Sequence, residues 1–138
     1  MGRAKLFAYD WDEDGLLELL IGTHSKIRPT NASLYEKAEK NAGGATVMLI
    51  DNVGTPEKPI WGQIYAVVQK GGQPLDYGRH GCAPIMVDRN KDGRHTMLVG
   101  TEDGFFYRFE KDELELSEDI IPPLADAAAE SVYPSNGI

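Results

Sequence analysis

Short apolar segments of strand length recur along this chain, separated by polar segments that contain glycine. Residues 5–9 alternate enough for a short strand, and residues 16–21 are apolar except for Glu18. The same order returns at residues 83–87 and 96–99. Alternation is typical of a half-buried strand, and a continuous apolar run is typical of a strand buried on both faces. The pattern therefore predicts a unit of strand, loop and strand that is used twice.

Further strands are predicted between and after the two copies. Residues 30–44 interrupt the first copy, where Ser33 to Glu36 resembles a helix capping box and Gly43-Gly44 is a typical helix stop. We therefore expect a short helical insertion there. The remaining predicted strands are 45–50, 60–69, the aromatic segment 105–109, and 112–116 as a polar edge strand that closes the second sheet.

The spacing of the repeated unit predicts the fold. The two polar loops begin at residues 10 and 88, so they lie 78 residues apart (88 − 10). Without the insertion, each unit approaches the size of one β-propeller blade, which has four short strands. We expect an all-β fold of about two four-stranded antiparallel blades over residues 1–120. We expect residues 121–138, which are rich in Pro and Ala, to form an irregular tail.

The loops of the two copies share a pattern of oxygen donors. The first has Asp10, Asp12 and Asp14 before a glycine, and the second has Asp88, Asn90 and Asp92 before a glycine. A hard cation such as calcium needs six to eight oxygens, and donors at alternate positions supply them when a glycine lets the backbone bend. The alternative is a plain turn, because Asp, Asn and Gly also fill tight loops for backbone reasons.

Composition narrows the possible functions. The chain has 138 residues, a formal charge of −8 and 41% hydrophobic residues, which suits one globular domain. Cys82 is the single cysteine, which excludes an intrachain disulfide and a cysteine-based zinc site. The acidic balance argues against a nucleic-acid partner. No apolar run approaches the roughly 18 residues of a membrane span, and none near the start has signal-peptide length.

Asp88 to Gly93, which runs on into residues 97–107, resembles the FG-GAP/VCBS repeat family, the calcium-loop blades of integrin-like β-propellers. Residues 10–23 are similar, and residues 51–59 resemble a linker that such repeats carry. The resemblance covers about residues 4–26 and 45–111. It implies a secreted, periplasmic or cell-surface location and loops that each hold one calcium ion.

The resemblance also implies the calcium ligands. The second loop would supply two charged ligands where the first supplies four, and its ninth residue, Thr96, is a poor calcium ligand. We therefore expect the second loop to bind calcium more weakly than the first. In the first loop the implied ligands are Asp10, Asp12, Asp14, the carbonyl of Leu16, and Glu18; in the second they are Asp88, Asn90, Asp92, the carbonyl of Arg94, and Thr96.

About two blades are too few for a single-chain propeller, which needs at least four. Three explanations stay open, of which we favour the first. The chain is a fragment of a longer protein, it completes a ring with further copies of itself, or it packs against a different chain.

A second group of residues is a candidate for chemistry on sugars. Tyr77, Arg79 and His80 lie among glycines just before the second core unit. Some carbohydrate-active propellers with similar repeats are lyases that cut uronate polysaccharides. There Arg79 would neutralise the sugar carboxylate, His80 would remove a proton and Tyr77 would donate one. The alternative is a turn whose arginine pairs with a nearby carboxylate. Lys26, Arg28 and Tyr35 would grip a second acidic sugar.

The aromatic residues are mostly expected in the core. We expect Trp61 and the aromatic side chains of 105–109 to be buried. Trp11 either stacks on a sugar or packs between blades, and we favour packing.

The leading function is therefore a calcium-stabilised scaffold or glycan-binding segment of a secreted carbohydrate-active or adhesive protein. The alternative is part of the catalytic propeller of a polysaccharide lyase. The residues do not decide between these, nor do they identify the glycan.

Overall fold

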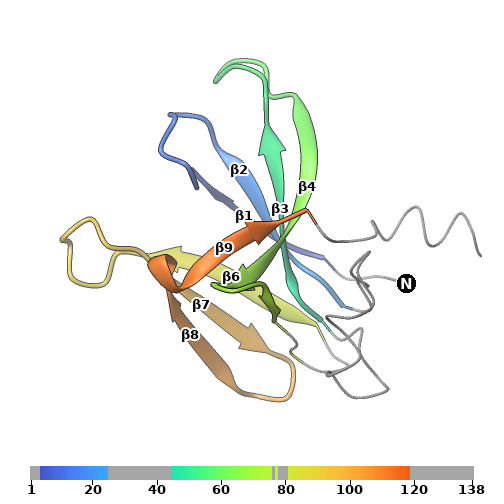
Figure 1. The fold of residues 1–138 in the computed structure, drawn as a ribbon, viewed down its shortest axis with the longest axis vertical. Helices are drawn as coiled ribbons and strands as arrows, with labels where there is room; N and C mark the ends of the chain where they lie inside the picture. Colours follow the sequence, from blue (N-terminus) through green and yellow to red (C-terminus); the bar gives the residue numbers. More distant parts are fainter. Residues whose placement is uncertain (1–3, 25–44, 76, 78–80, 119–138) are drawn as a thin grey trace, which may run out of the picture.

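The computed structural model describes residues 4–24, 45–75, 77 and 81–118, and this part of the chain is all-β with antiparallel pairing throughout (Figure 1). The expected helix within 30–44 and the tail 121–138 lie outside the described residues. The strands are β1 (Lys5–Tyr9), β2 (Glu18–Gly22), β3 (Val47–Asn52), β4 (Trp61–Gln69), β5 (Gln73–Pro74), β6 (Cys82–Val87), β7 (Thr96–Thr101), β8 (Phe106–Glu110) and β9 (Leu114–Ser117).

The first sheet is a meander of consecutive strands, β1-β2-β3-β4, with β5 and β9 both paired to the end of β4. The register of β1 and β2 sets Tyr9 opposite Glu18, so the acidic loop is the connection that closes this hairpin. The second sheet has the order β6-β7-β8, and its first hairpin likewise sets Val87 opposite Thr96 around the second loop. The repeated strand–loop–strand unit is thus confirmed, although closed propeller blades are not shown.

The prediction for the last strand is wrong in its partner. β9 was expected to close the second sheet beside β8, but it pairs with β4 of the first sheet, with Val67 opposite Leu116 (Figure 1). A short 3-10 helix, Lys111–Glu113, turns the chain away from β8. The Lys70 amide donates to the Glu113 carbonyl at 3.0 Å, and Leu114 is buried in the core. Apolar burial at Leu114 and Leu116 therefore selects β4 over the free edge of β8.

The core lies between the two sheets. β6 packs against β1 and β2, and Gly22 allows this approach because a Cβ there would lie 2.0 Å from the Cys82 carbonyl oxygen. Trp11 is buried in this core, as favoured from the sequence, and its ring meets Tyr9 edge-on. The buried residues of this cluster are Trp11, Leu20, Ala45, Val47, Leu49, Val67, Leu75, Tyr77, Cys82, Met86, Met97, Val99 and Leu114.

The expectation that the other aromatic residues are core is mostly wrong. Phe105, Phe106 and Tyr107 are 61%, 84% and 38% exposed, and Trp61 is 48% exposed. Phe106 pairs with Gly100 on the face of β8 opposite Tyr107 and Phe109, and that face points away from the first sheet. Only Phe109 of these residues packs against the core from a partly buried position. Strand alternation therefore places Phe106 on an uncovered face.

Within the described residues, no helix has the length and apolar character needed to cross a membrane.

Replacing Leu20, which is fully buried in the core, by alanine is expected to lower the free energy of unfolding by about 2–5 kcal/mol because it leaves a cavity. The matched control is Leu6→Ala, since Leu6 is 64% exposed and its loss is expected to cost no more than about 0.5 kcal/mol. Urea unfolding of the two variants measures both values. Equal effects would contradict the position of the core.

Candidate metal centre

The loop between β1 and β2 gathers four carboxylates around one point. Asp10, Asp12 and Asp14 lie in the loop, and Glu18 is the first residue of β2. One carboxylate oxygen from each of the four lies within 4.8 Å of the others. This arrangement can hold a metal ion, and it consists of four of the five ligands that the resemblance implies for this loop.

The backbone of the loop is shaped by its own aspartates. The two carboxylate oxygens of Asp10 accept hydrogen bonds from the Asp14 amide at 3.1 Å and the Gly15 amide at 2.9 Å. Asp14 in turn accepts from the Leu16 amide at 2.8 Å. Gly15 has φ +90°, which glycine adopts without a steric penalty. These bonds bend the chain so that alternate side chains converge, while the predicted role of the Leu16 carbonyl as a ligand stays a prediction.

Glu18 differs from the three aspartates because it is buried. Its side chain is 2% exposed, and Oε2 accepts a 2.6 Å hydrogen bond from the Trp11 amide. Its other oxygen, Oε1, is buried without a hydrogen-bond partner among the described residues. Burial raises the pKa of this carboxyl, the Trp11 amide lowers it, and the neighbouring aspartates raise it further. A buried carboxylate oxygen that lacks a partner and faces three more carboxylates is what a bound cation would satisfy.

The second loop repeats this backbone. Asp88 accepts from the amides of Asp92 at 3.1 Å and Gly93 at 3.0 Å, and Asp92 accepts from the Arg94 amide at 3.0 Å. Gly93 has φ +81°, and Lys91 has a positive φ, as Glu13 does in the first loop. Each of these bonds has its counterpart in the first loop 78 residues earlier. The two loops are therefore the same structure and not two unrelated turns.

The donor sets of the two loops nevertheless differ at the ninth position. Thr96 replaces Glu18, is also buried, and donates its hydroxyl to Glu110 Oε2 at 2.9 Å. Asn90 and Arg94 are exposed. The part played by Glu110 was missed from the sequence, because only the β7–β8 register sets it opposite Thr96. The second loop thus has a protein partner where the first has an unsatisfied oxygen, and its predicted metal site stays a prediction.

Tyr77 is the one member of the predicted sugar site that the structure describes. It is buried, its amide donates to the Ala45 carbonyl at 2.9 Å, and its ring lies 4.9 Å from that of Tyr107. Its hydroxyl is buried without a hydrogen-bond partner within the described ranges, and burial raises its pKa far above the ordinary value. The other members lie outside the described residues: Arg79, His80, Lys26, Arg28 and Tyr35. The hypothesis that this chain is part of a polysaccharide lyase therefore stays a prediction from the sequence.

Comparison with known proteins finds no match to a protein family, to a curated protein or to a solved structure. The acidic centre therefore stands on the geometry of this chain alone, and the resemblance to FG-GAP/VCBS repeats stays a prediction.

Without metal, the protein is expected to lose stability as the pH rises through the titration of Glu18. Because the pKa of Glu18 is raised in the folded state, its contribution is full below the ordinary value of 4.5 and is lost as the pH passes the raised value. The Glu18→Gln variant has no such titration and keeps the bond from Trp11, so its stability should fall less in this pH range. Thermal melting of both metal-stripped proteins from pH 4 to pH 8 measures the difference. Parallel profiles would contradict the raised pKa.

Proposed function

We propose that this chain is a calcium-stabilised β-propeller segment that acts as a scaffold or glycan-binding part of a secreted carbohydrate-active or adhesive protein. The observation that carries the calcium part is the buried Glu18 carboxylate, whose Oε1 has no hydrogen-bond partner in the described part of the chain and belongs to a group of four acids. An uncompensated buried charge is strongly unfavourable, so a bound cation is the simplest partner for it.

The donor set favours calcium among common cations. All four side chains offer carboxylate oxygens, which hard cations prefer, and within the described residues no histidine or cysteine joins the group as a zinc site would require. Magnesium demands a tighter octahedral geometry and usually keeps several waters. Donors at alternate positions, followed by a glycine and a carboxylate at the ninth position, supply the larger and more flexible shell of calcium.

The ion would act on the fold through the loop. It would offset the mutual repulsion of four carboxylates beside the core. Trp11 sits in the same loop, donates its amide to Glu18 and buries its ring between the sheets. A metal that holds the loop therefore also holds this aromatic residue in the core. This supports a structural role for the ion.

Two features support the view that the chain is part of a larger propeller. The same loop recurs in each sheet, and the sheets pack face to face around one core. Apolar side chains remain exposed on the outward faces, among them Leu6 of β1, Ile85 of β6 and Phe106 of β8. A further blade, either from a longer chain or from another copy, would cover them. The free edge of β8 would then receive the strand that β9 does not provide.

Calcium is expected to stabilise the purified protein. At a calcium concentration about one hundred times the dissociation constant, binding adds about 2.7 kcal/mol, which should raise the melting temperature by roughly 10 °C. Asp10→Asn and Glu18→Gln should each reduce this shift strongly because they remove charged ligands. Scanning calorimetry with and without calcium measures it.

The matched control is Asp88→Asn, which makes the same change as Asp10→Asn at the same place in the second loop. It should leave most of the calcium-induced shift intact, because the group of four acids, with the Glu18 oxygen that has no partner among the described residues, lies in the first loop. Native mass spectrometry then counts the bound ions. The absence of any calcium-induced shift in the unmodified protein would overturn the metal centre.

A further inference from the structure

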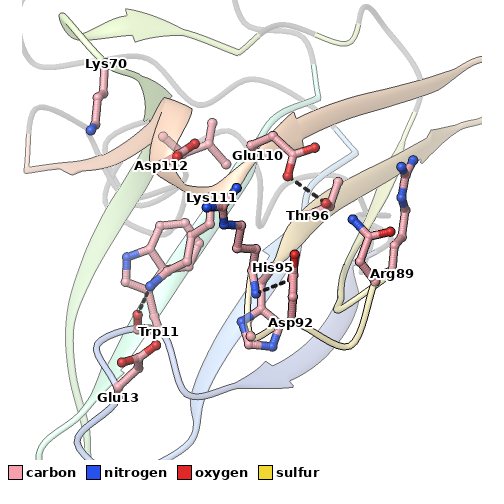
Figure 2. Close-up of a pocket in the computed structure, with 14 residues that line it drawn as sticks. Trp11, Glu13, Lys70, Arg89, Asp92, His95, Thr96, Glu110, Lys111 and Asp112 are labelled. Atoms are coloured by element: carbon pink, nitrogen blue, oxygen red, sulfur yellow. Dashed lines mark hydrogen bonds between the residues drawn. The ribbon is translucent and has the colours of Figure 1, made fainter.

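A cavity of about 670 Å³ lies between the two loops and the 3-10 helix (Figure 2). Its size is within the range of about 300–1,000 Å³ that is usual for pockets that bind small ligands. Trp11 and Glu13 reach it from the first loop, and Lys111 and Asp112 reach it from the 3-10 helix. The second loop contributes half of the lining residues, from Arg89 to Thr96 with the exception of Lys91.

Basic side chains are concentrated around this cavity. The described part of the chain has eight lysines and arginines, and four of them line it: Lys70, Arg89, Arg94 and Lys111. This concentration is unexpected in a chain whose net charge is −8. Figure 2 shows Lys70, Lys111 and Arg89 coming from separate parts of the chain around one space. They lie on the β4–β5 turn, the 3-10 helix and the second loop, so only the tertiary structure brings them together.

Three of these four side chains have no other role in the described structure. Lys111 donates to the Trp11 carbonyl and lies over the Trp11 ring at 5.3 Å, which gives it a structural task. For Lys70, Arg89 and Arg94, the structure shows no ion pair and no side-chain hydrogen bond within the described residues. Arg89 and Arg94 are also exposed. These two guanidinium groups are free to bind an oxyanion, for which their planar forks are well suited.

Acidic residues that line the cavity are equal in number to the basic ones, but two of these carboxylates already accept hydrogen bonds. Glu110 accepts from Thr96 and lies 3.8 Å from Arg108, and Asp92 accepts from the Arg94 amide. Glu13 and Asp112 are exposed at the edge. Glu110 and Asp92 thus already accept some of the hydrogen bonds that they can accept. Within the described residues, the guanidinium groups of Arg89 and Arg94 donate none. The wall therefore offers a surplus of free donors.

The two loops have the same backbone but opposite charge. Residues 10–18 contain five acids and no base, which gives −5, while residues 88–96 contain two acids and three bases, which gives +1. Arg89 and Arg94 occupy the positions of Trp11 and Leu16, which carry no charge. In the second loop Asp88 and Asp92 keep the bend through their hydrogen bonds to the backbone. The second loop thus has the same backbone bend as the first, but it carries three basic side chains where the first carries none.

We propose that this cavity binds an acidic oligosaccharide, with Arg89 and Arg94 of the second loop and Lys70 as the groups that hold its oxyanions. The oxyanion is either the carboxylate of a uronic acid or a sulfate ester, since guanidinium groups bind both. Trp11 and Leu114 also line the cavity. This inference rests on the proposed function for the choice of a saccharide, and it does not require that the metal centre be calcium.

The test is calorimetric titration of metal-stripped protein with three oligosaccharides of equal length. These are an oligogalacturonate, a sulfated oligogalactose and a neutral oligogalactose. At least one acidic ligand is expected to bind, and the neutral one is expected to bind at least tenfold more weakly. The acidic ligand that binds identifies the source of the oxyanion. Equal binding of neutral and acidic ligands, or no binding of either acidic ligand at millimolar concentration, overturns the proposal.

A pair of double variants separates the cavity from the overall charge of the protein. Arg89→Ala/Arg94→Ala removes two charges from its wall, and Lys5→Ala/Lys58→Ala removes two exposed charges elsewhere. The first is expected to weaken binding at least tenfold and the second less than twofold. Equal losses show that only net charge attracts the ligand and overturn the site. Circular dichroism confirms that both variants fold.

The same samples keep this test apart from that of the metal centre. The calcium-induced melting shift of each double variant is measured alongside its affinity for the saccharide. Binding of the acidic ligand without any calcium shift contradicts the metal centre and leaves the cavity supported. A calcium-induced shift without saccharide binding supports the metal centre and contradicts the saccharide site in the cavity.

Discussion

The burial of the Glu18 carboxylate is the constraint on which the rest of this structure depends. The group lies at the start of β2, at the point where the acidic loop meets the core. One oxygen has the Trp11 amide and the other has no hydrogen-bond partner among the described residues. Trp11 can enter the core only if the loop brings its backbone to Glu18, so the acidic group and the apolar core are joined at a single contact. A charge in that position needs a counter-charge, which gives the metal proposal its physical basis.

Comparison of the two loops distinguishes the residues that bend the backbone from the residues that determine the charge of the loop. Asp10 and Asp88 each bind two amides of the following residues, Asp14 and Asp92 each bind one more, and the same bend forms twice. The bend is therefore independent of the ninth residue, which differs between the loops. At the ninth position one loop has a buried carboxylate and the other a threonine held by Glu110. The same backbone thus carries a group of four acids in one loop and three basic side chains in the other.

The path of β9 connects the two sheets, which differ in their number of strands. Instead of extending the sheet in which its chain has just run, β9 crosses to β4 and carries Leu114 into the shared core. The 3-10 helix that directs it also supplies Lys111, whose ammonium group binds the Trp11 carbonyl. The end of the described chain therefore reaches back to the first loop. The same crossing forms one wall of the cavity, and among the described strands none pairs with the outer edge of β8.

The sequence by itself determined the local features. Strand periodicity located every described strand except the two-residue β5 to within a few residues, and the spacing of Asp10, Asp12 and Asp14 located the acidic loop, because both signals depend on neighbouring residues in the chain. Tertiary structure decided the partner of β9, the exposure of Phe106, the pairing of Thr96 with Glu110, and the cavity. Each of these depends on which face of a strand another sheet covers, or on residues brought together from distant parts of the chain. No local pattern contains that information, since alternation gives two faces to every strand without saying which one is covered.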